Sequence, residues 1–495
     1  MNRTVRQTFQ VTVMMAGLLA AAAPALADPP SRVARLNYAK GSVSLRPAAL
    51  DEWGAATVNE PLTTGDHLWT DVESWAELHV GSTAIRLAPQ TAFAFLNLDD
   101  GMVQLRVSEG AVAVHKKNLD GNDGFEINTP SAAVVLSEPG VYRVDVLPGA
   151  SDTRVTVRQG SAEVFADNAS FRVYEGQTAA ITGTGYVSHE VFRAGAPDDW
   201  ERWCRARDDR EDRSDSLRFV SYEMTGYEDL DEYGAWESVP EYGWAWAPRQ
   251  VEAGWAPYRH GHWRWIEPWG WTWIDQAPWG FAPFHYGRWA CHRGRWLWVP
   301  GSYATHPVYA PALVAFVGGN GWGLSFGLGH QNTLAWFPLA PGEVWMPHYH
   351  ASHAYINNLN HTSVRGSIVV NNYQVSRGTY VNRAITGAVT AVPRDAFLGG
   401  RAVSRYAAAV DRRAAMSGEI VGTSAAVAPR ADSVVTRGAG VRRPPAAAVT
   451  RAVVVRTEPP AAPVPFQVRE RTLQAQAGRP LDDAAMESLR RTGGS

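Results

Sequence analysis

The 495-residue chain contains only two cysteines, Cys204 and Cys291. So few cysteines exclude a disulfide-stabilised scaffold, in which cysteines are dense and paired. In an oxidising compartment the two could form a single bridge, and the alternative is two separately buried thiols. A lipoprotein anchor is excluded too, because lipidation requires a cysteine at the cleavage point near the N-terminus.

Long hydrophobic runs are also missing, apart from one near the N-terminus. Two arginines precede the apolar run Val11 to Ala23, which is shorter than the roughly 20 residues of a membrane-spanning helix. Ala25-Leu26-Ala27 then shows the small-residue pattern that signal peptidases read. Residues 1–27 are predicted to be a cleaved signal peptide, with an uncleaved anchor as the less favoured alternative. We therefore expect a periplasmic or secreted protein with no transmembrane segment after cleavage.

Recognisable catalytic motifs are absent. The chain has no Gly-x-Ser-x-Gly nucleophile elbow and no His-Glu-x-x-His zinc motif. His348, His350 and His353, or the pair His260 and His262, could gather a metal, but no cysteine or carboxylate stands in close register to complete a set. We predict no catalytic residue, no metal and no cofactor. A hydrolase with two carboxylates far apart in the sequence would leave no such motif.

Lysine is absent from the last part of the chain. Residues 401–495 contain 15 arginines and 8 acidic residues, a net charge of +7, whereas the whole chain carries −3. The rest of the chain is therefore close to −10. A basic tail on an acidic body favours contact with an anionic surface or with the body itself, rather than with nucleic acid. Its Ala-, Arg-, Pro- and Val-rich composition predicts a mostly disordered tail.

Short runs of β-branched residues fill positions 32–191. A phrase in which glycine is followed by small residues and then Val or Leu recurs at Gly41, Gly110 and Gly160. Glycine before a strand suits a turn that needs a positive φ. The recurrence predicts stacked β-hairpins in a sandwich or a short solenoid.

Two sets of motifs in this region carry a family resemblance. One set is Leu62–Thr70 with Gly81–Leu87, and the other is Phe125–Pro130 leading into Gly140–Val144. With these motifs, residues 36–190 resemble the FecR-type periplasmic domain, an all-β module. In the iron-uptake regulators of that family the module receives a signal from an outer-membrane receptor, and a cytoplasmic part controls a sigma factor. This chain has a signal peptide where those regulators have cytoplasmic and transmembrane segments, so only the β module carries over.

Residues 197–232 are predicted to form a charged, helical linker. Asp198 can cap a helix together with Glu201, three residues later. The other face of this helix would carry alternating arginines and acids, exposed to solvent and ion-paired. The residues that share one helical face are Trp200, Trp203 and Cys204.

Residues 233–400 are rich in tryptophan. The stretch from Tyr233 to Gly301 holds 13 of the 21 tryptophans and few aliphatic residues. Within it, Trp255-Ala256-Pro257-Tyr258 returns as Phe281-Ala282-Pro283-Phe284, a shift of 26 residues. Alternating tryptophans bounded by Pro and Gly predict short hairpins with aromatic faces. With Pro-Trp-Gly-Trp at 268–271 and Pro-Leu-Ala-Pro-Gly-Glu at 338–343, residues 220–400 resemble an uncharacterised Trp-rich family of exported bacterial proteins.

The tryptophans have two interpretations. They can fill a core that lacks Leu and Ile, or they can form an exposed face that binds a sugar or a protein. We expect the strip Trp269, Trp271 and Trp273 to point inward. The expected exposed ligand-binding patch consists of Trp263, Trp265, Tyr286, Trp289, Arg264 and Arg288. Arginine beside aromatic rings suits an anionic partner.

The sequence thus predicts a mainly β protein with a FecR-like sandwich or solenoid, a helical linker, a Trp-rich hairpin domain and a disordered tail. The best-fitting function is binding or scaffolding in the cell envelope, with an envelope protein or an anionic polysaccharide as partner. One alternative is an envelope signalling component that receives a receptor segment through the FecR-like domain. Another is a polysaccharide or cell-wall hydrolase with dispersed carboxylates.

Overall fold

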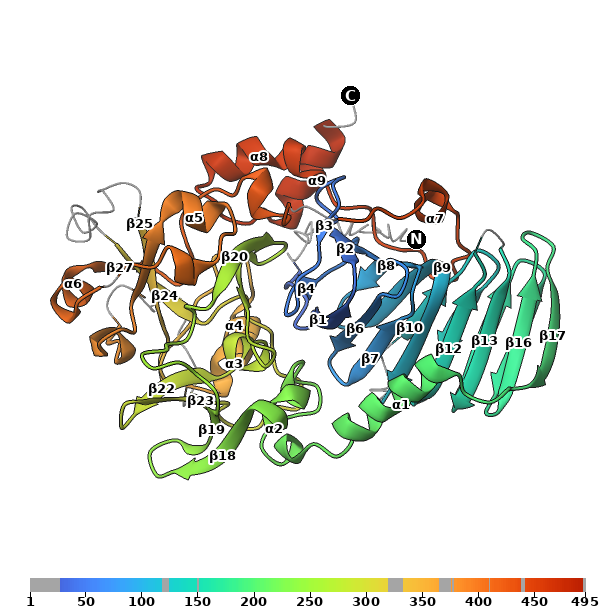
Figure 1. Ribbon diagram of the computed structural model, residues 1–495. Coiled ribbons are helices and arrows are strands. Elements are labelled where there is room, and N and C mark those ends of the chain that lie inside the picture. Colours follow the sequence, from blue (N-terminus) through green and yellow to red (C-terminus); the bar gives the residue numbers. More distant parts are fainter. Residues whose placement is uncertain are drawn as a thin grey trace, which may run out of the picture.

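The computed structural model describes residues 27–117, 124–148, 151–318, 333–364, 375, 378–408, 410–437 and 441–492. Residues 1–26 of the predicted signal peptide lie outside these ranges. Figure 1 shows a β module on one side, a Trp-rich domain on the other, and C-terminal helices that cross from one to the other. No helix within the described ranges is long and apolar enough to span a bilayer.

The β module consists of strands β1 to β17. Their bounds are β1 Ala34–Lys40, β2 Val43–Arg46, β3 Gly54–Ala55, β4 Pro61–Leu62, β5 His67–Thr70, β6 Trp75–Val80, β7 Thr83–Leu87, β8 Thr91–Leu98, β9 Met102–Lys116, β10 Gly124–Asn128, β11 Ala133–Leu136, β12 Gly140–Val146, β13 Thr153–Gln159, β14 Ser161–Ala166, β15 Ala169–Tyr174, β16 Gln177–Thr182 and β17 Ser188–Arg193. Neighbouring strands pair antiparallel, except for the parallel pair β9 and β10. The predicted mainly β fold is confirmed.

The long strand β9 belongs to two sheets. Its first half pairs with β8 and β10, and its second half pairs with β7 and β12. The strand bends at Gly110, where φ is 89° and an added Cβ would lie only 2.4 Å from the hydroxyl of Thr91. Gly41 and Gly160 also have positive φ, so the three recurring glycines occupy the conformation predicted for them. The bend lets one strand contribute to both layers around a single apolar core.

The linker begins with helix α1, Asp199–Glu211. Asp198 caps it, and the capping box with Glu201 is present as predicted. The rest of the linker is η1 Asp215–Arg218, η2 Tyr227–Asp229 and α2 Leu230–Tyr233. The predicted solvated charged face is wrong in part, because Asp208 and Glu211 are buried where both meet Arg86 of β7. Burial of these charges anchors the helix to the β module.

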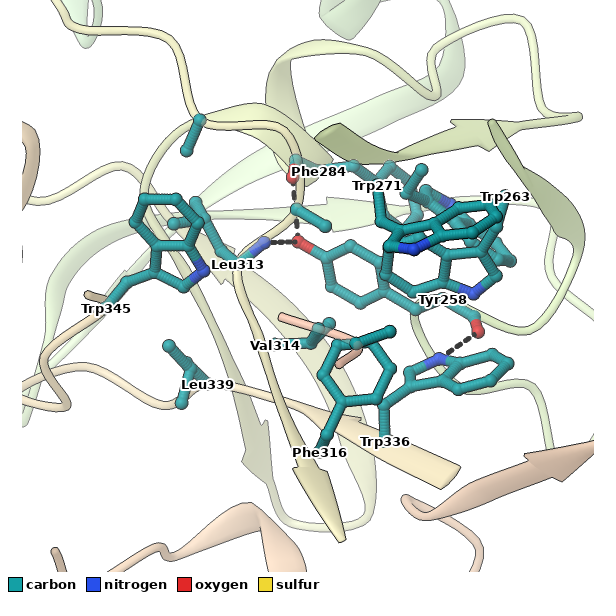
Figure 2. Packing of buried hydrophobic residues seen from close by; sticks show 14 of the residues in the cluster. Tyr258, Trp263, Trp271, Phe284, Leu313, Val314, Phe316, Trp336, Leu339 and Trp345 are labelled. Carbon is teal, nitrogen blue, oxygen red and sulfur yellow. Dashed lines mark hydrogen bonds between the residues drawn. The ribbon is translucent and has the colours of Figure 1, made fainter. Parts of the chain in front are cut away.

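The Trp-rich domain is built from short hairpins and helices. Its elements are β18 Gly234–Val239, β19 Gly243–Pro248, β20 Gly261–Ile266, β21 Gly270–Asp275, α3 Ala282–His285, β22 Arg288–His292, β23 Arg295–Val299, β24 Val314–Gly318, β25 Thr333–Pro338, α4 His353–His361, η6 Asn382–Ala384, β26 Thr390–Pro393, α5 Arg394–Leu398 and η7 Val403–Arg405. The 26-residue repeat is structural, since β20 and β22 each open a hairpin. Its equivalent residues Tyr258 and Phe284 pack edge to face at 4.9 Å, and the Tyr258 hydroxyl donates to the Phe284 carbonyl (Figure 2).

Tryptophans supply the core of this domain. Trp263 contacts the rings of Trp273, Trp336 and Phe316 at centroid distances of 5.5, 5.3 and 5.6 Å. The indole N–H of Trp336 donates to the carbonyl of Tyr258, as Figure 2 shows. The three tryptophans predicted to point inward, Trp269, Trp271 and Trp273, are all buried. Trp271 and Trp273 lie on β21, whereas Trp269 lies in the turn before it and not on the same strand as predicted. Packed indoles thus replace the missing aliphatic side chains, and some of them, such as Trp336 and Trp271, also donate their N–H to a main-chain carbonyl.

The predicted disorder of residues 401–495 is wrong for the described part of that segment. Its elements are α6 Arg412–Ser417, β27 Glu419–Gly422, η8 Ala431–Ser433, α7 Ala446–Thr450, α8 Phe466–Ala475 and α9 Asp483–Thr492. β27 pairs with β24, and Phe466 and Leu473 of α8 are buried in the Trp-rich core. Arg437 also pairs with Glu52 of the β module. The segment has no separate core, but eleven of its buried side chains belong to the core of the Trp-rich domain.

A buried arginine joins the β module to the linker and the Trp-rich domain. Arg35 of β1 is fully buried and pairs with Glu228 and Asp229 of η2 at 3.1 and 2.7 Å. It also donates to the carbonyl of Pro278 and to the side chain of Asn59. A charge without water must be paired to avoid a large desolvation cost, so these contacts hold the parts in one arrangement.

Candidate functional site

The patch predicted to bind a ligand is not on the surface. Its six residues, Trp263, Trp265, Tyr286, Trp289, Arg264 and Arg288, are between 1 and 5% exposed. The Arg288 guanidinium donates to the carbonyl of Glu343 and the side chain of Asn360. The predicted exposure is therefore wrong. The aromatic rings belong to a core short of aliphatic residues, and Arg264 lies 3.8 Å from the buried carboxylate of Glu60.

The other candidate groups of the sequence stay apart. Cys204 lies buried on α1 and Cys291 lies on β22, and both are free thiols. Burial raises the pKa of Cys204 to about 12. Among the described residues, three potential metal ligands come within reach of one another at Glu77, His79 and Glu211, not at the histidines singled out in the sequence. Arg86 and Arg207 already pair with Glu77, so this cluster is a buried charge network.

One groove on the Trp-rich domain combines exposed aromatic surface with hydrogen-bonding groups. It has a volume of about 740 Å³ and is lined by residues between Glu232 and Trp279. The size suits a small ligand or a few sugar rings. One side is formed by the end of α2 and the loop after β19, and the other by residues that flank the hairpin β20–β21.

The aromatic wall of the groove is Trp255. Its ring is partly exposed and packs against Trp279 at 5.8 Å and Trp289 at 5.5 Å, which are both buried. The backbone N–H of Trp255 also donates to the carbonyl of Glu252 in a tight turn. Tyr233, at the end of α2, is partly exposed on the groove as well. Packing against two buried indoles thus holds a tryptophan that remains partly exposed.

The polar side of the groove comes from the two ends of one hairpin. His260 precedes β20 and Gln276 follows β21, and the N–H of Gln276 donates to the carbonyl of His260 at 2.9 Å. Burial lowers the pKa of His260, so its imidazole is neutral at pH 7 and offers one donor and one acceptor. Glu232, Arg249 and Glu252 are exposed at the rim. The rim thus carries two carboxylates and one guanidinium.

The base of the groove is held by the β module. Ala277 and Pro278 line it, and their carbonyls accept hydrogen bonds at 2.7 Å from Asn59 and Arg35 respectively. Both donors belong to the buried network that joins the domains. The groove is therefore preformed, and a ligand need not pay to order these segments.

Two other hollows are less suited to a ligand of defined chemistry. A wide cleft of about 1140 Å³ near α4 is lined by Tyr242, His361 and two asparagines, and no tryptophan is among its lining residues. A cavity of about 360 Å³ lies between the β module, the turn after β20 and α8, with mostly apolar walls. Neither combines a partly exposed indole with facing amide and imidazole groups.

Residues 227–357 match the model of a family of unknown function, DUF6600. All residues that line the groove fall inside this segment. The predicted resemblance to an uncharacterised Trp-rich family is thus confirmed over this narrower range. No curated protein matches the chain.

Two crystal structures of a "putative anti-sigma factor from Parabacteroides distasonis ATCC 8503" align with 26% of this chain. The sequence identities are 16 and 15%, and the TM-score is 0.23 in both. The aligned part of this chain spans 60% of that protein's length. The alignment does not establish a shared fold, so the FecR resemblance stays a prediction.

Two groove residues belong to patterns noted in the sequence, Trp255 to the repeat and His260 to a possible metal-binding pair, but neither pattern predicts a groove. Trp255 occupies the same repeat position as Phe281, yet Trp255 is partly exposed and Phe281 is fully buried. Which of many tryptophans reaches solvent depends on what packs over it. Only the tertiary structure distinguishes them.

Proposed function

We propose that this protein is an exported binding protein of the cell envelope, and that the groove of the DUF6600-like segment binds a glycan. The observation that carries the proposal is that the partly exposed Trp255 lines one groove together with Gln276 and His260. The C–H face of a sugar ring packs on an aromatic face, while its hydroxyls need donors and acceptors of the amide and imidazole kind.

The charge of the rim indicates the kind of glycan. Glu232 pairs with Arg210 at 3.5 Å, and the remaining rim charges of Glu252 and Arg249 are opposite in sign. The rim therefore has no excess of positive charge to attract an acidic sugar. The anionic polysaccharide predicted from Arg264 and Arg288 has no support here, since both arginines are buried. A neutral or N-acetylated polysaccharide fits the groove better.

Binding is favoured over hydrolysis. An acid catalyst at neutral pH is usually a carboxyl group whose apolar surroundings raise its pKa. Glu232 and Glu252 are both exposed to solvent at the rim.

The test is a titration followed by tryptophan fluorescence and calorimetry, with chitooligosaccharides, dextran oligosaccharides and alginate oligosaccharides as probes. We expect one of the first two to bind and alginate to bind more weakly. Trp255→Ala should weaken binding about 30-fold, the equivalent of about 2 kcal/mol for a central aromatic contact. Gln276→Ala should weaken it roughly threefold to tenfold.

The matched control is Trp244→Ala, because Trp244 is 51% exposed and lies outside the groove. It should bind as the parent protein does. Equal affinity of the parent and Trp255→Ala, or no binding of any probe, would refute the glycan proposal. Release of reducing ends that is lost in Glu232→Gln or Glu252→Gln would replace binding by hydrolysis.

A second candidate, envelope signalling, is favoured by the terminal strand β17. This strand pairs with β16, and no other described strand pairs with its outer edge. All six of its side chains are exposed, including Val191 at 39% and Phe192 at 43%. An open edge of this kind can accept an extended segment of a partner protein.

A photo-crosslinking residue tests this second candidate. Placed at Val191, it should capture a defined envelope protein in living cells. The same residue at Val72, which is 61% exposed in a loop, is the control. Equal capture from both positions would argue against a specific edge partner.

A further inference from the structure

An extended stretch of the C-terminal segment crosses the outer face of β9 and β10. We call residues 446–457, which comprise α7 and the seven residues after it, the strap. Figure 1 shows α7 beside this end of the β module. The strap runs over the side of the sheet that faces away from the core.

The face beneath the strap is polar because of strand alternation. On β9, Val103, Leu105 and Val107 enter the core, so the residues between them point outward. Those outward residues are Gln104, Arg106 and Ser108 of β9, with Glu126 and Asn128 of β10 beside them. The parallel register places Gln104 next to Glu126 and Arg106 next to Asn128.

These side chains hold the main chain of the strap. Gln104 donates to the carbonyl of Thr457 at 2.7 Å, and Asn128 donates to the carbonyl of Val454 at 2.9 Å. The carboxylate of Glu126 accepts from the N–H of Arg456 at 2.9 Å. Further bonds run from Arg106 to the carbonyl of Arg451, from Ser108 to that of Ala448, and from the N–H of Val454 to the carbonyl of Thr129. Recognition is therefore by backbone groups, which every extended peptide has.

Two arginines of the strap contact the β module with their side chains. Arg451 donates to the carbonyl of Ser108, and the Arg456 guanidinium lies 4.2 Å from the centre of the Phe165 ring. The strap's apolar side chains contribute little. Ala452, Val455 and Thr457 are exposed. One small residue is the anchor: Ala448 is fully buried in a pocket with Trp69 and Ala92. A segment that buries so little apolar surface is held weakly and opens locally at low cost. The polar face beneath it would be solvated on opening, which lowers the cost further.

We propose that the outer face of β9 and β10 is a peptide-binding site that the strap occupies in cis. The partner that it binds in trans is an extended protein segment with a small residue at the position of Ala448 and basic residues at those of Arg451 and Arg456. The cis strap competes with that partner, so the site is open only while the strap is released. This site is separate from the groove, and neither proposal depends on the other.

The test replaces Ala446–Thr457 with a Gly/Ser segment of equal length, which leaves α8 and α9 in place. A labelled synthetic peptide of residues 446–457 is then titrated by fluorescence anisotropy. The peptide should bind the replaced variant. Half-maximal binding to the parent protein should require at least a tenfold higher protein concentration, because the tethered strap competes at millimolar effective concentration. A peptide with arginine in place of the anchor Ala448 should bind at least tenfold more weakly.

Substitutions on the outer face of β9 and β10 test whether the peptide binds at this face. Glu126→Ala combined with Asn128→Ala, in the replaced variant, should abolish most of the binding. Arg154→Ala is the matched control, since Arg154 is exposed on β13 in the other sheet. A folded replaced variant that binds no peptide would overturn the proposal, and so would equal affinity for the parent. Exchange of straps between two copies, seen as a dimer of the parent, would assign the site to self-association instead.

Discussion

His79 should make the stability of this protein fall as the pH rises above neutral. Its side chain is buried between carboxylates from three elements: Glu77 of β6 at 3.3 Å, Glu211 of α1 at 3.5 Å and Glu228 of η2 at 3.1 Å. Burial alone would lower the pKa of His79, but the carboxylates outweigh it and raise the pKa to about 10. Arg86 and Arg35 complete the network around these acids.

The sign follows from comparison with the unfolded chain, where the histidine pKa is about 6.5. The pKa of His79 is higher in the folded protein than in the unfolded chain. Its protonated form therefore stabilises the folded protein fully below pH 6.5, and this stabilisation is lost as the pH rises through 10. At about 1.36 kcal/mol per pH unit, the full contribution is on the order of 5 kcal/mol. Between pH 6.5 and 9.5 the parent should lose roughly 3 to 4 kcal/mol of unfolding free energy from this group.

The assay is urea unfolding at pH 6.5, 8 and 9.5, for the parent and for His79→Gln. Other groups that titrate in this range are common to both proteins, so the difference between the two curves isolates His79. We expect the variant to be much less stable at pH 6.5 and nearly as stable as the parent at pH 9.5. His350→Gln, at an exposed position, is the control and should follow the parent. Parallel curves for the parent and His79→Gln would refute the assignment of a buried imidazolium.

Further predictions concern the core, the tail, the export signal and the thiols. Trp271→Ala should cost about 3 to 5 kcal/mol of unfolding free energy, because it leaves a cavity in a packed core; a cost below 1 kcal/mol in urea unfolding would contradict its burial. Truncation after Gly400 should lower the melting temperature by several degrees in circular dichroism, since it removes buried side chains. Mass spectrometry of exported protein should find Asp28 as the first residue. In the native protein iodoacetamide should modify the partly exposed Cys291 but not the buried Cys204, and no disulfide should be detected.

Local patterns allowed much of the fold to be predicted. The positive φ of Gly110 follows from the steric freedom of one residue, and the cap at Asp198 follows from hydrogen bonds within four residues. Alternation predicted that Trp271 and Trp273 share one face of a strand. Each of these features depends on residues that are close in sequence, so the physics that determines it is readable there.

The errors arose where the outcome depends on distant parts of the chain. The composition around Arg264 does not reveal that other elements cover it, and the tail looked disordered because it lacks a core of its own. Phe466 is nevertheless buried in the core of the Trp-rich domain. The sequence predicted a solvent-exposed Asp208, but in the structure this carboxylate pairs with Arg86 of the β module.

The sequence by itself determined the strand-rich class, the glycine turns, the helix cap and the supply of indoles for a core, because these follow from local sterics and periodicity. Only the tertiary structure decided that Trp255 keeps an open face, that the arginines of the expected patch are buried, and that the strap lies on β9. The exposure of a side chain and the residues it contacts depend on segments that are far apart in the chain. No local sequence pattern encodes which of these segments will pack together.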